Sequence, residues 1–309
     1  MTFFAGATGD FQIYGGNFTN ITGDLVRTIV RTKRAHSSNS PLAEKIVRLS
    51  GYGPASVAQA QYRLDLIAHW PIATGARVLE LGCGQGITTL ALAEAVGPNG
   101  HVDAVDPGPL DHGDTISAGP LGPRIEWVQA ESLAFLEAHP ATTWDAVVIA
   151  HSLWYFATPA LVGDTLRALG ARTKRICIAE WSLESEPGSS ALTHVLAVLA
   201  QGALQCRKPH STSNVHTVVS PAAIKALTAS AGLVLLREAR VMPHAGTARV
   251  VRPQFKEEVE AFVEDEREKG MMYAMRDAVE ANLARMGGMQ HVDTMDGWVA
   301  IFEPNLDID

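Results

Sequence analysis

The chain contains a glycine-rich turn that separates an apolar segment from a helical one. Residues 78–81 are apolar apart from Glu80, and a stretch with helical character begins at Ile87. Glycine occupies every second position of the turn between them: Gly82, Gly84 and Gly86. Glycine lets the backbone bend sharply and approach a ligand with no side chain in the way, and the following helix presents free N–H groups. This segment therefore predicts a nucleotide-binding turn between a strand and a helix.

Short apolar, β-branched segments alternate with helical ones after residue 77. The predicted strands cover residues 78–81, 102–105, 125–128, 146–149 and 176–179, and the predicted helices between them cover residues 87–95, 132–138 and 159–169. Further strands are predicted at residues 233–236 and 298–302. Alternation of apolar strands with helices indicates a parallel sheet that is covered on both faces. The predicted fold is α/β, with a doubly wound, mostly parallel sheet of seven strands.

The predicted organisation is one large domain with helical additions. The chain has 309 residues, of which 47% are apolar, so it can bury a sizeable core. Residues 1–70 are expected to form an N-terminal helical cap, and residues 71–309 the ligand-binding domain. Helical insertions are expected at about residues 183–219 and 243–296. We expect both insertions to gather over the active face.

An acidic residue, Asp106, ends the second predicted strand and follows the turn at the distance expected of a ribose-binding acid. A carboxylate there can accept hydrogen bonds from both hydroxyls of a ribose. The dinucleotide fingerprint requires glycine at the third position after its second glycine, where this chain has Ile87. Glu80, inside the first strand, would repel a pyrophosphate but suits the α-amino group of a methionine moiety. An NAD-dependent oxidoreductase is therefore the more distant alternative.

The acidic residue followed by Gly-x-Gly-x-Gly resembles the first motif of the class I S-adenosylmethionine-dependent methyltransferases. The resemblance covers roughly residues 70–240 and the final strand. It implies a Rossmann-like fold, with S-adenosylmethionine as cofactor and S-adenosylhomocysteine as its product. It also implies that Asp106 binds the ribose, that the segment after the third strand contacts the adenine, and that the segment after the fourth contacts the methionine end. The cofactor-binding residues implied in this way are Glu80, Gly82, Cys83, Gly84, Gly86, Asp106, Pro107, Ala130, Glu131, Ala150 and His151.

Three residues near the ends of the fourth and fifth strands are candidate catalytic groups: His151, Tyr155 and Glu180. Methyl transfer from a sulfonium is an in-line displacement, so the protein mainly aligns the nucleophile, and a base is needed only where the nucleophile must lose a proton. His151 suits that role because histidine titrates near neutrality, although it could equally bond the backbone or the cofactor. Glu180 could orient an amine or act as the base, or it could cap a helix or meet solvent. Tyr155 and its neighbour Trp154 could line a pocket for an aromatic or cationic substrate, or belong to the core.

No metal site is predicted. The cysteines lack the paired spacing of a metal cage: Cys83, Cys177 and Cys206. The polar residues of the first insertion lie too far apart for a tight metal-binding motif: His210, Asn214 and His216.

The second insertion is predicted to hold two helices, a charged one over residues 255–269 and a methionine-rich one over residues 271–286. The acidic residues of the first helix indicate a side that faces solvent. Methionines of the second, together with Tyr273, could form an adaptable lid over a substrate or pack one side of an ordinary helix. These methionines are Met271, Met272 and Met275.

The predicted function is S-adenosylmethionine-dependent methyl transfer to oxygen, nitrogen or sulfur of a small-molecule metabolite. The chain as a whole resembles methyltransferases of fungal or bacterial secondary metabolism. A net charge of −8 without a basic stripe argues against a nucleic-acid partner, as does the lack of Asn/Asp-Pro-Pro-Tyr/Phe after the fourth strand. Two alternatives keep the fold: a non-methylating rearrangement or decarboxylation that uses the same cofactor, and a scaffold protein without catalysis.

The chain is expected to be cytoplasmic. It begins without the basic segment and apolar core of a signal peptide, and no apolar run approaches the roughly 20 residues that cross a bilayer. The N-terminal helices could cover the site of their own subunit or exchange across a homodimer.

Overall fold

The computed structural model describes residues 40–51, 56–110, 113–185, 189–208, 215–243 and 255–305. Predictions for residues 1–39, and for His210 and Asn214, lie outside the described residues. Within the described part, no helix is both long and apolar enough to span a membrane.

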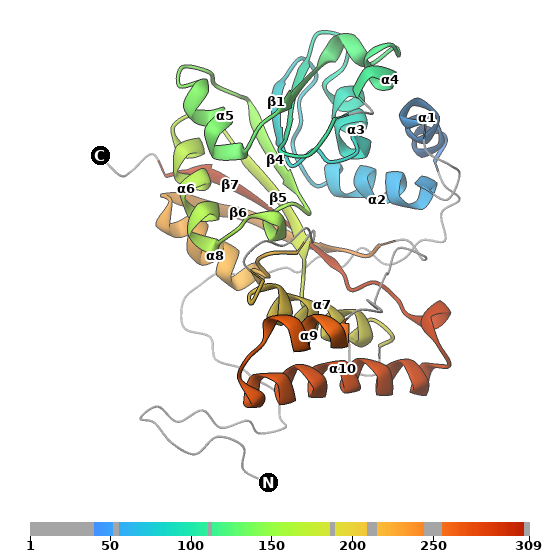
Figure 1. The fold of residues 1–309 in the computed structure, drawn as a ribbon. Coiled ribbons are helices and arrows are strands. Elements are labelled where there is room, and N and C mark those ends of the chain that lie inside the picture. The colour runs from blue at the N-terminus through green and yellow to red at the C-terminus, as the bar shows by residue number, and fades with distance from the viewer. Residues whose placement is uncertain are drawn as a thin grey trace.

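One sheet forms the centre of the molecule (Figure 1). Across the sheet, its seven described strands are β3 (Ile125–Gln129), β2 (His101–Asp106), β1 (Arg77–Leu81), β4 (Ala146–Ala150), β5 (Ile176–Trp181), β7 (Gly297–Pro304) and β6 (Leu233–Val241). β7 runs antiparallel to β5 and β6, and the remaining pairs are parallel. This arrangement confirms the predicted α/β fold. The strand order changes direction between β1 and β4, where open α/β sheets bind ligands outside the carboxyl ends of their strands.

Side chains of each strand alternate between two cores, one on each face of the sheet. In β1, Val78 belongs to one core, whereas Leu79 and Leu81 belong to the other. All of β4 is buried, as expected of a central strand in a parallel sheet. The first face carries α1 (Pro41–Ser50), α2 (Val57–Ile67) and α3 (Ile87–Val96), with the short α4 (Gly113–Ser117) nearby; the second carries α5 (Ser132–Ala138), α6 (Pro159–Gly170) and α8 (Pro221–Ser230) (Figure 1).

Three of these helices begin at a hydroxyl cap followed by proline. Ser40 precedes α1, Thr158 precedes α6 and Ser220 precedes α8, and in each the side-chain oxygen accepts a backbone N–H of the first turn at 3.2 Å. Proline tolerates the first helical position because its missing N–H would have no partner there. Local sequence therefore fixes where these helices begin.

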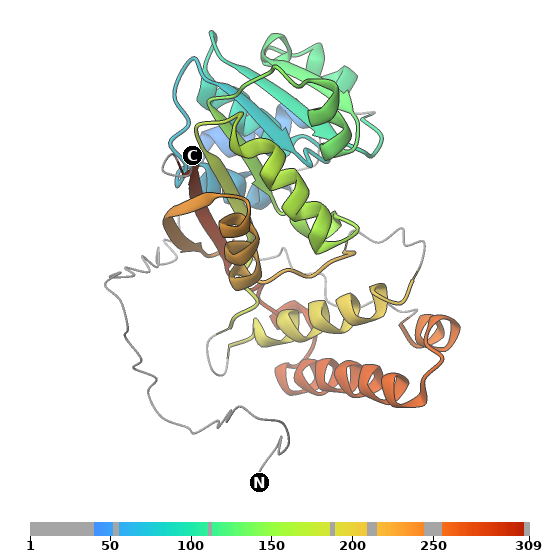
Figure 2. The ribbon, with the colours of Figure 1, turned by 90° about the vertical axis from the view of Figure 1, so that its left-hand side faces the viewer.

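Three further helices form a separate layer beyond the sheet (Figure 2). They are α7 (Leu192–Gln205), α9 (Phe255–Phe262) and α10 (Glu266–Met286). β5 ends at Trp181, which is paired with Gly297 at the start of β7, so the chain leaves for this layer and returns from it at the carboxyl edge of the parallel strands. The layer has a small core of its own, which includes Leu204, Val259 and Met272.

One predicted boundary inside this layer is wrong. The charged helix expected over residues 255–269 ends at Phe262, and α10 already begins at Glu266. Asp265 sets the new start, because its Oδ1 accepts the N–H groups of Arg267 and Glu268 at 2.9 and 3.0 Å. Gly270 lies inside α10, where its low helix propensity, about 1 kcal/mol below that of alanine, does not interrupt so long a helix.

The structure places α1 and α2 in the same core as α3 and the first face of the sheet. The predicted domain limits at residues 70 and 71, and those of the two insertions, stay predictions.

Candidate active site

The glycine turn after β1 adopts a conformation that favours glycine. Gly82, Gly84 and Gly86 have φ values of 81°, 49° and 79°. A Cβ at Gly82 would lie 2.3 Å from the Cβ of Ser152, whose hydroxyl donates to the Leu81 carbonyl at 2.7 Å. The turn is thus packed against the segment that leaves β4. A Cβ at Gly84 would meet no atom within 4 Å, so the space beside this glycine is open to a ligand.

Asp106 at the end of β2 holds the turn from the other side. Its Oδ2 accepts the N–H of Gly84 and its Oδ1 accepts the N–H of Gly108, both at 2.8 Å. A carboxylate oxygen has more than one lone pair, so each oxygen can also accept a hydroxyl. The next residue, Pro107, is exposed beside it.

Glu80 lies beneath the turn and is only 1% exposed. Its Oε2 accepts the hydroxyl of Thr89 on α3 at 2.6 Å, which ties β1 to the helix that follows the turn. Burial raises the pKa of Glu80 to about 7, against the opposing effect of the Thr89 hydrogen bond. The structure thus gives Glu80 a partner within the protein, and its role toward a methionine amino group stays a prediction.

The other residues predicted to contact a cofactor lie at the same edge of the sheet. Cys83 is buried and donates its N–H to Val105 at 3.2 Å, and Ala130 donates to the Asp106 carbonyl at 3.0 Å. Glu131 is exposed at the start of α5. Ala150, the last residue of β4, is buried.

His151 joins three elements at the carboxyl edge. Its φ of 55° is unusual for a residue other than glycine, and its N–H donates to Ala179 of β5 at 2.8 Å. Its Nε2 lies 3.0 Å from the hydroxyl of Tyr62 on α2. Its Nδ1 lies 3.3 Å from Oε1 of Glu180 on β5. The structure therefore brings two predicted catalytic residues together and adds Tyr62 to them.

Burial makes the His151–Glu180 pair electrically neutral near pH 7. Glu180 is 1% exposed; its Oε1 accepts the N–H of Trp181 at 3.0 Å, and its Oε2 has no hydrogen-bond partner among the described residues. Burial raises the pKa of Glu180 to about 8 and lowers the pKa of His151 well below its ordinary value. The imidazole is then unprotonated and can accept a proton, which is the state a general base requires.

Aromatic rings enclose this pair. The Trp181 ring centroid lies 4.2 Å from that of His151 and 6.1 Å from that of Tyr62, on which it stacks. The edge of Trp181 meets His194 of α7 at 5.4 Å. His194 is held by the N–H of Met295, which donates to its Nδ1 at 3.1 Å, and burial lowers its pKa to about 4. The insertion layer therefore reaches the candidate site through this histidine.

Sequence reasoning missed Tyr62 and His194. Tyr62 lies within the predicted N-terminal helical cap, 89 positions away from its partner His151. His194 lies in a helix whose pattern is that of an ordinary apolar segment. Neither carries a local motif, so only the tertiary arrangement identifies them.

Two other predicted pocket residues do not join the pair. Trp154 is buried and its Nε1 donates to the Val219 carbonyl at 3.0 Å, so it belongs to the core. Tyr155 is 49% exposed at the end of the turn Leu153–Tyr155.

Of the methionine-rich helix, Met272 is buried in the core of the insertion layer and Met271 is 59% exposed. The packing interpretation of Met272 is confirmed.

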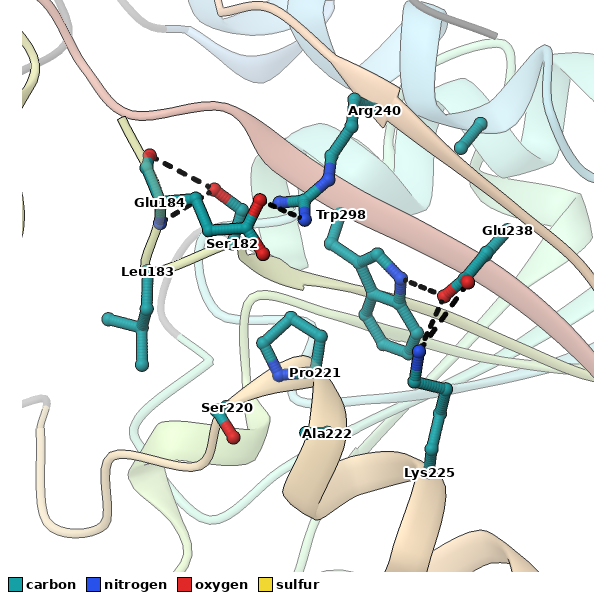
Figure 3. A pocket seen from close by; sticks show the side chains of 11 residues that line it. Ser182, Leu183, Glu184, Ser220, Pro221, Ala222, Lys225, Glu238, Arg240 and Trp298 are labelled. Carbon is teal, nitrogen blue, oxygen red and sulfur yellow. Dashed lines mark hydrogen bonds and ion pairs between the residues drawn. The ribbon is translucent and has the colours of Figure 1, made fainter. Parts of the chain in front are cut away.

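A cavity of about 390 Å³ lies at the edge of the sheet formed by β6 and β7, and neither His151 nor Glu180 lines it (Figure 3). Glu180 is paired across the sheet with Trp298, which is paired with Arg240 of the cavity wall, so the cavity lies two strands from Glu180. Its charged side chains neutralise each other: Arg240 contacts Glu184 at 2.5 Å, and Lys225 contacts Glu238 at 3.0 Å. A volume of this size accommodates a small ligand.

One group of described residues has distances suited to a metal ion: His101, Asp103 and Glu126. It lies at the start of β2, at the opposite end from the turn. Arg77 donates to both oxygens of Asp103 at 2.9 and 3.1 Å, and the Trp144 indole donates to it at 2.5 Å. The arginine thus already neutralises this carboxylate, and we assign no metal to the group.

The raised pKa of Glu180 predicts a pH effect on stability. The unfolded carboxyl ionises near its ordinary value, whereas the folded one keeps its proton up to about pH 8. Between these values the folded state binds more protons, so the free energy of unfolding falls as pH rises. We expect the Glu180→Gln variant, which cannot titrate, to gain stability relative to the parent between about pH 5 and pH 8 in urea unfolding.

Thr115→Ser, at an exposed position of α4, is the control: neither side chain ionises in this range, so its difference from the parent should stay constant. A constant difference for Glu180→Gln as well would show that Glu180 ionises normally.

A sheet of this strand order, with a glycine turn after β1 and an acid at the end of β2, is the arrangement of the class I S-adenosylmethionine-dependent methyltransferases. Residues 78–172 match the model of a family described as a methyltransferase domain. The chain is 28% identical to the methyltransferase phomM and 29% identical to the methyltransferase phomM′, both of Diaporthe leptostromiformis, over 73% of this chain and 73% of each relative. It is an enzyme that depends on S-adenosylmethionine.

The fold is shared with a cyclopropane-fatty-acyl-phospholipid synthase-like protein from Lactobacillus casei. The TM-score is 0.67 with 21% identity, over 84% of this chain and 98% of the other. At this level of identity the likeness concerns the fold alone.

Proposed function

We propose that this enzyme transfers the methyl group of S-adenosylmethionine to oxygen, nitrogen or sulfur of a small-molecule metabolite, with His151 as general base and Glu180 as its partner. The observation that carries the proposal is the buried, neutral His151–Glu180 pair at the carboxyl edge of β4 and β5. A neutral imidazole in a water-poor site can remove a proton from a hydroxyl or an ammonium group as the nucleophile attacks.

The turn fits the cofactor by shape and by chemistry. The open space at Gly84 leaves room for a ligand, and Asp106 stands beside it with oxygens that can accept hydroxyls. In this proposal Asp106 binds the ribose, Ala130 and Glu131 lie against the adenine, and the segment at Ala150 and His151 meets the methionine end. The bound cofactor supplies the activated methyl group.

Tyr62 extends the proposed base into a relay. Nδ1 of His151 lies 3.3 Å from Oε1 of Glu180 but has no hydrogen-bond partner among the described residues, so the relay requires a small rotation of the imidazole. If a protonated Oε1 then donates to Nδ1, Nε2 carries the hydrogen that is donated to the Tyr62 hydroxyl. When Glu180 is ionised, the tautomer reverses and Nε2 accepts from Tyr62 instead. In this second state the Tyr62 oxygen can accept a proton from the substrate while the Tyr62 hydroxyl proton moves to Nε2, so one proton is gained and one is passed on.

A substrate of the small-molecule class agrees with the charge of the chain and with its cavity. A net charge of −8 disfavours a polyanion such as nucleic acid, and the cavity at the edge formed by β6 and β7 has the volume of a small ligand. The test is a titration with S-adenosylmethionine, S-adenosylhomocysteine and NAD⁺, followed by a substrate screen read by mass. A product heavier by one methyl group supports the proposal, whereas turnover without that gain would favour a non-methylating reaction.

Loss of the proposed ribose acid should weaken cofactor binding. We expect Asp106→Ala to reduce the affinity for S-adenosylhomocysteine by about 1–3 kcal/mol, because a charged hydrogen-bond partner is removed. Calorimetric titration measures this change directly. Asp164→Ala, on α6, where the side chain is 47% exposed, should leave the affinity unaltered. Equal affinities for the parent and Asp106→Ala would move the cofactor site elsewhere.

A further inference from the structure

One guanidinium in the site forms no ion pair with the residues that the structure describes. Arg63 follows Tyr62 on α2, and its Nη1 is buried without a hydrogen-bond partner among the described residues. The centre of the guanidinium lies 5.7 Å from the centroid of the Tyr62 ring. A charge withdrawn from water without a partner is costly, so such a group is expected to gain one when the site is filled.

The charge of Arg63 acts on groups from several elements at the carboxyl edge. Burial raises the pKa of Glu80 to about 7 and that of Glu180 to about 8, and in both the Arg63 cation acts in the opposite direction. After the dominant effect of burial, the same cation contributes to the lowered pKa of His151. Arg63 is therefore close enough to influence both Glu80, beneath the glycine turn, and the His151–Glu180 pair.

The two neighbouring acids do not neutralise it. Neither Glu80 nor Glu180 forms an ion pair with Arg63, since Glu80 bonds Thr89 and Glu180 bonds the backbone of Trp181. Burial also raises the pKa of both carboxyls, which reduces their negative charge near neutral pH. Asp65 and Asp296 lie near enough to raise the pKa of the adjacent Tyr62, but the buried Nη1 of Arg63 has no hydrogen-bond partner among the described residues and is left for a ligand.

We propose that Arg63 is an anion-binding residue of this site and that it takes a carboxylate. A guanidinium binds a carboxylate through two parallel hydrogen bonds, and one cation beside two carboxyl groups suits a monoanion better than a phosphate. The carboxylate could come from the amino-acid end of the cofactor or from the substrate. This inference rests on the proposed function, because it assumes that the cofactor binds at this edge.

The first arm of the test asks whether the cofactor is the source. Three ligands are titrated: S-adenosylhomocysteine, decarboxylated S-adenosylmethionine and 5′-methylthioadenosine. Arg63→Met should bind the first ligand roughly 10- to 100-fold more weakly than the parent, and the other two, which lack the carboxylate, with nearly parental affinity. Arg63→Lys should retain part of the affinity because it keeps the charge but loses the two-pronged geometry. Arg167→Met, exposed on α6, is the matched control.

The second arm asks whether the substrate is the source. If all Arg63 variants bind S-adenosylhomocysteine as the parent does, the protein saturated with that ligand is titrated with acetate, and with methylammonium as a cation control. If the parent binds acetate and Arg63→Met does not, the carboxylate belongs to the substrate. Equal responses of the parent and of both Arg63 variants in the two arms would overturn the proposal.

Failure of the proposed function gives a different result. In that case the parent itself binds neither S-adenosylhomocysteine nor 5′-methylthioadenosine, and this inference falls with it. Thermal unfolding of each variant confirms that it is folded, and Arg63→Lys supplies the comparison if Arg63→Met does not fold.

Discussion

The His151→Asn variant should methylate its substrate about 10²- to 10⁴-fold more slowly than the parent, with little change in cofactor affinity. The reason is that asparagine cannot accept the proton that the neutral imidazole is placed to remove. Asparagine is chosen because His151 has a φ of 55°, a conformation that asparagine tolerates better than alanine does. The rate is measured under saturating cofactor on the first substrate that the mass screen yields.

Two comparisons make this result specific. His291→Asn, at an exposed position of the turn Met289–His291, should retain the parental rate. Tyr62→Phe removes the hydroxyl that faces Nε2 and should slow the reaction less than His151→Asn does, because the base itself remains. If His151→Asn methylates at the parental rate, alignment by the protein suffices for this nucleophile and the base assignment is wrong.

Alanine in place of Gly82 should destabilise the protein by about 2–5 kcal/mol and abolish cofactor binding. The new Cβ would lie 2.3 Å from the Cβ of Ser152, and the backbone φ of 81° is strained for any residue with a side chain. Relief requires the turn to move away from the segment after β4, which separates the groups that are proposed to bind the cofactor. Urea unfolding and titration with S-adenosylhomocysteine measure the two effects.

Gly51→Ala is the matched control for strain without a clash. Its φ is 75°, but an added Cβ meets no atom within 4 Å, so its destabilisation should be near 1–2 kcal/mol, without loss of binding. The double variant Gly82→Ala with Ser152→Gly should recover part of the stability, since it removes the atom that clashes. Equal losses for Gly51→Ala and Gly82→Ala would contradict the role of close packing.

The sheet could be predicted because its signals are local. Each strand from β1 to β5 is a short apolar run between helical segments, and the glycines at alternate positions of residues 82–86 predict the turn. Asp106 could be placed because it ends the strand that follows the turn. These features depend on neighbours in the chain, so periodicity and spacing are enough to find them.

The centre of the candidate site could not be predicted in the same way. Tyr62 meets His151 across the sheet edge, His194 meets Trp181 from the insertion layer, and Arg63 has no local pattern that sets it apart from a surface arginine. For these residues the deciding interactions exist only in the folded chain. The boundary at Asp265 is different, because its capping bonds to Arg267 and Glu268 are local, and sequence reasoning missed them.

The placement of the insertion layer has an evolutionary consequence. Two separate stretches of chain build this layer, one between β5 and α8 and one between β6 and β7, and the layer has a core of its own. Changes within α7, α9 and α10 can therefore accumulate without disturbing the strands that carry the turn. His194 is the exception, because its contact with Trp181 supports the ring that packs on the His151–Glu180 pair. During evolution these inserted helices can be replaced and the substrate changed, provided that the new segments support Trp181 as His194 does.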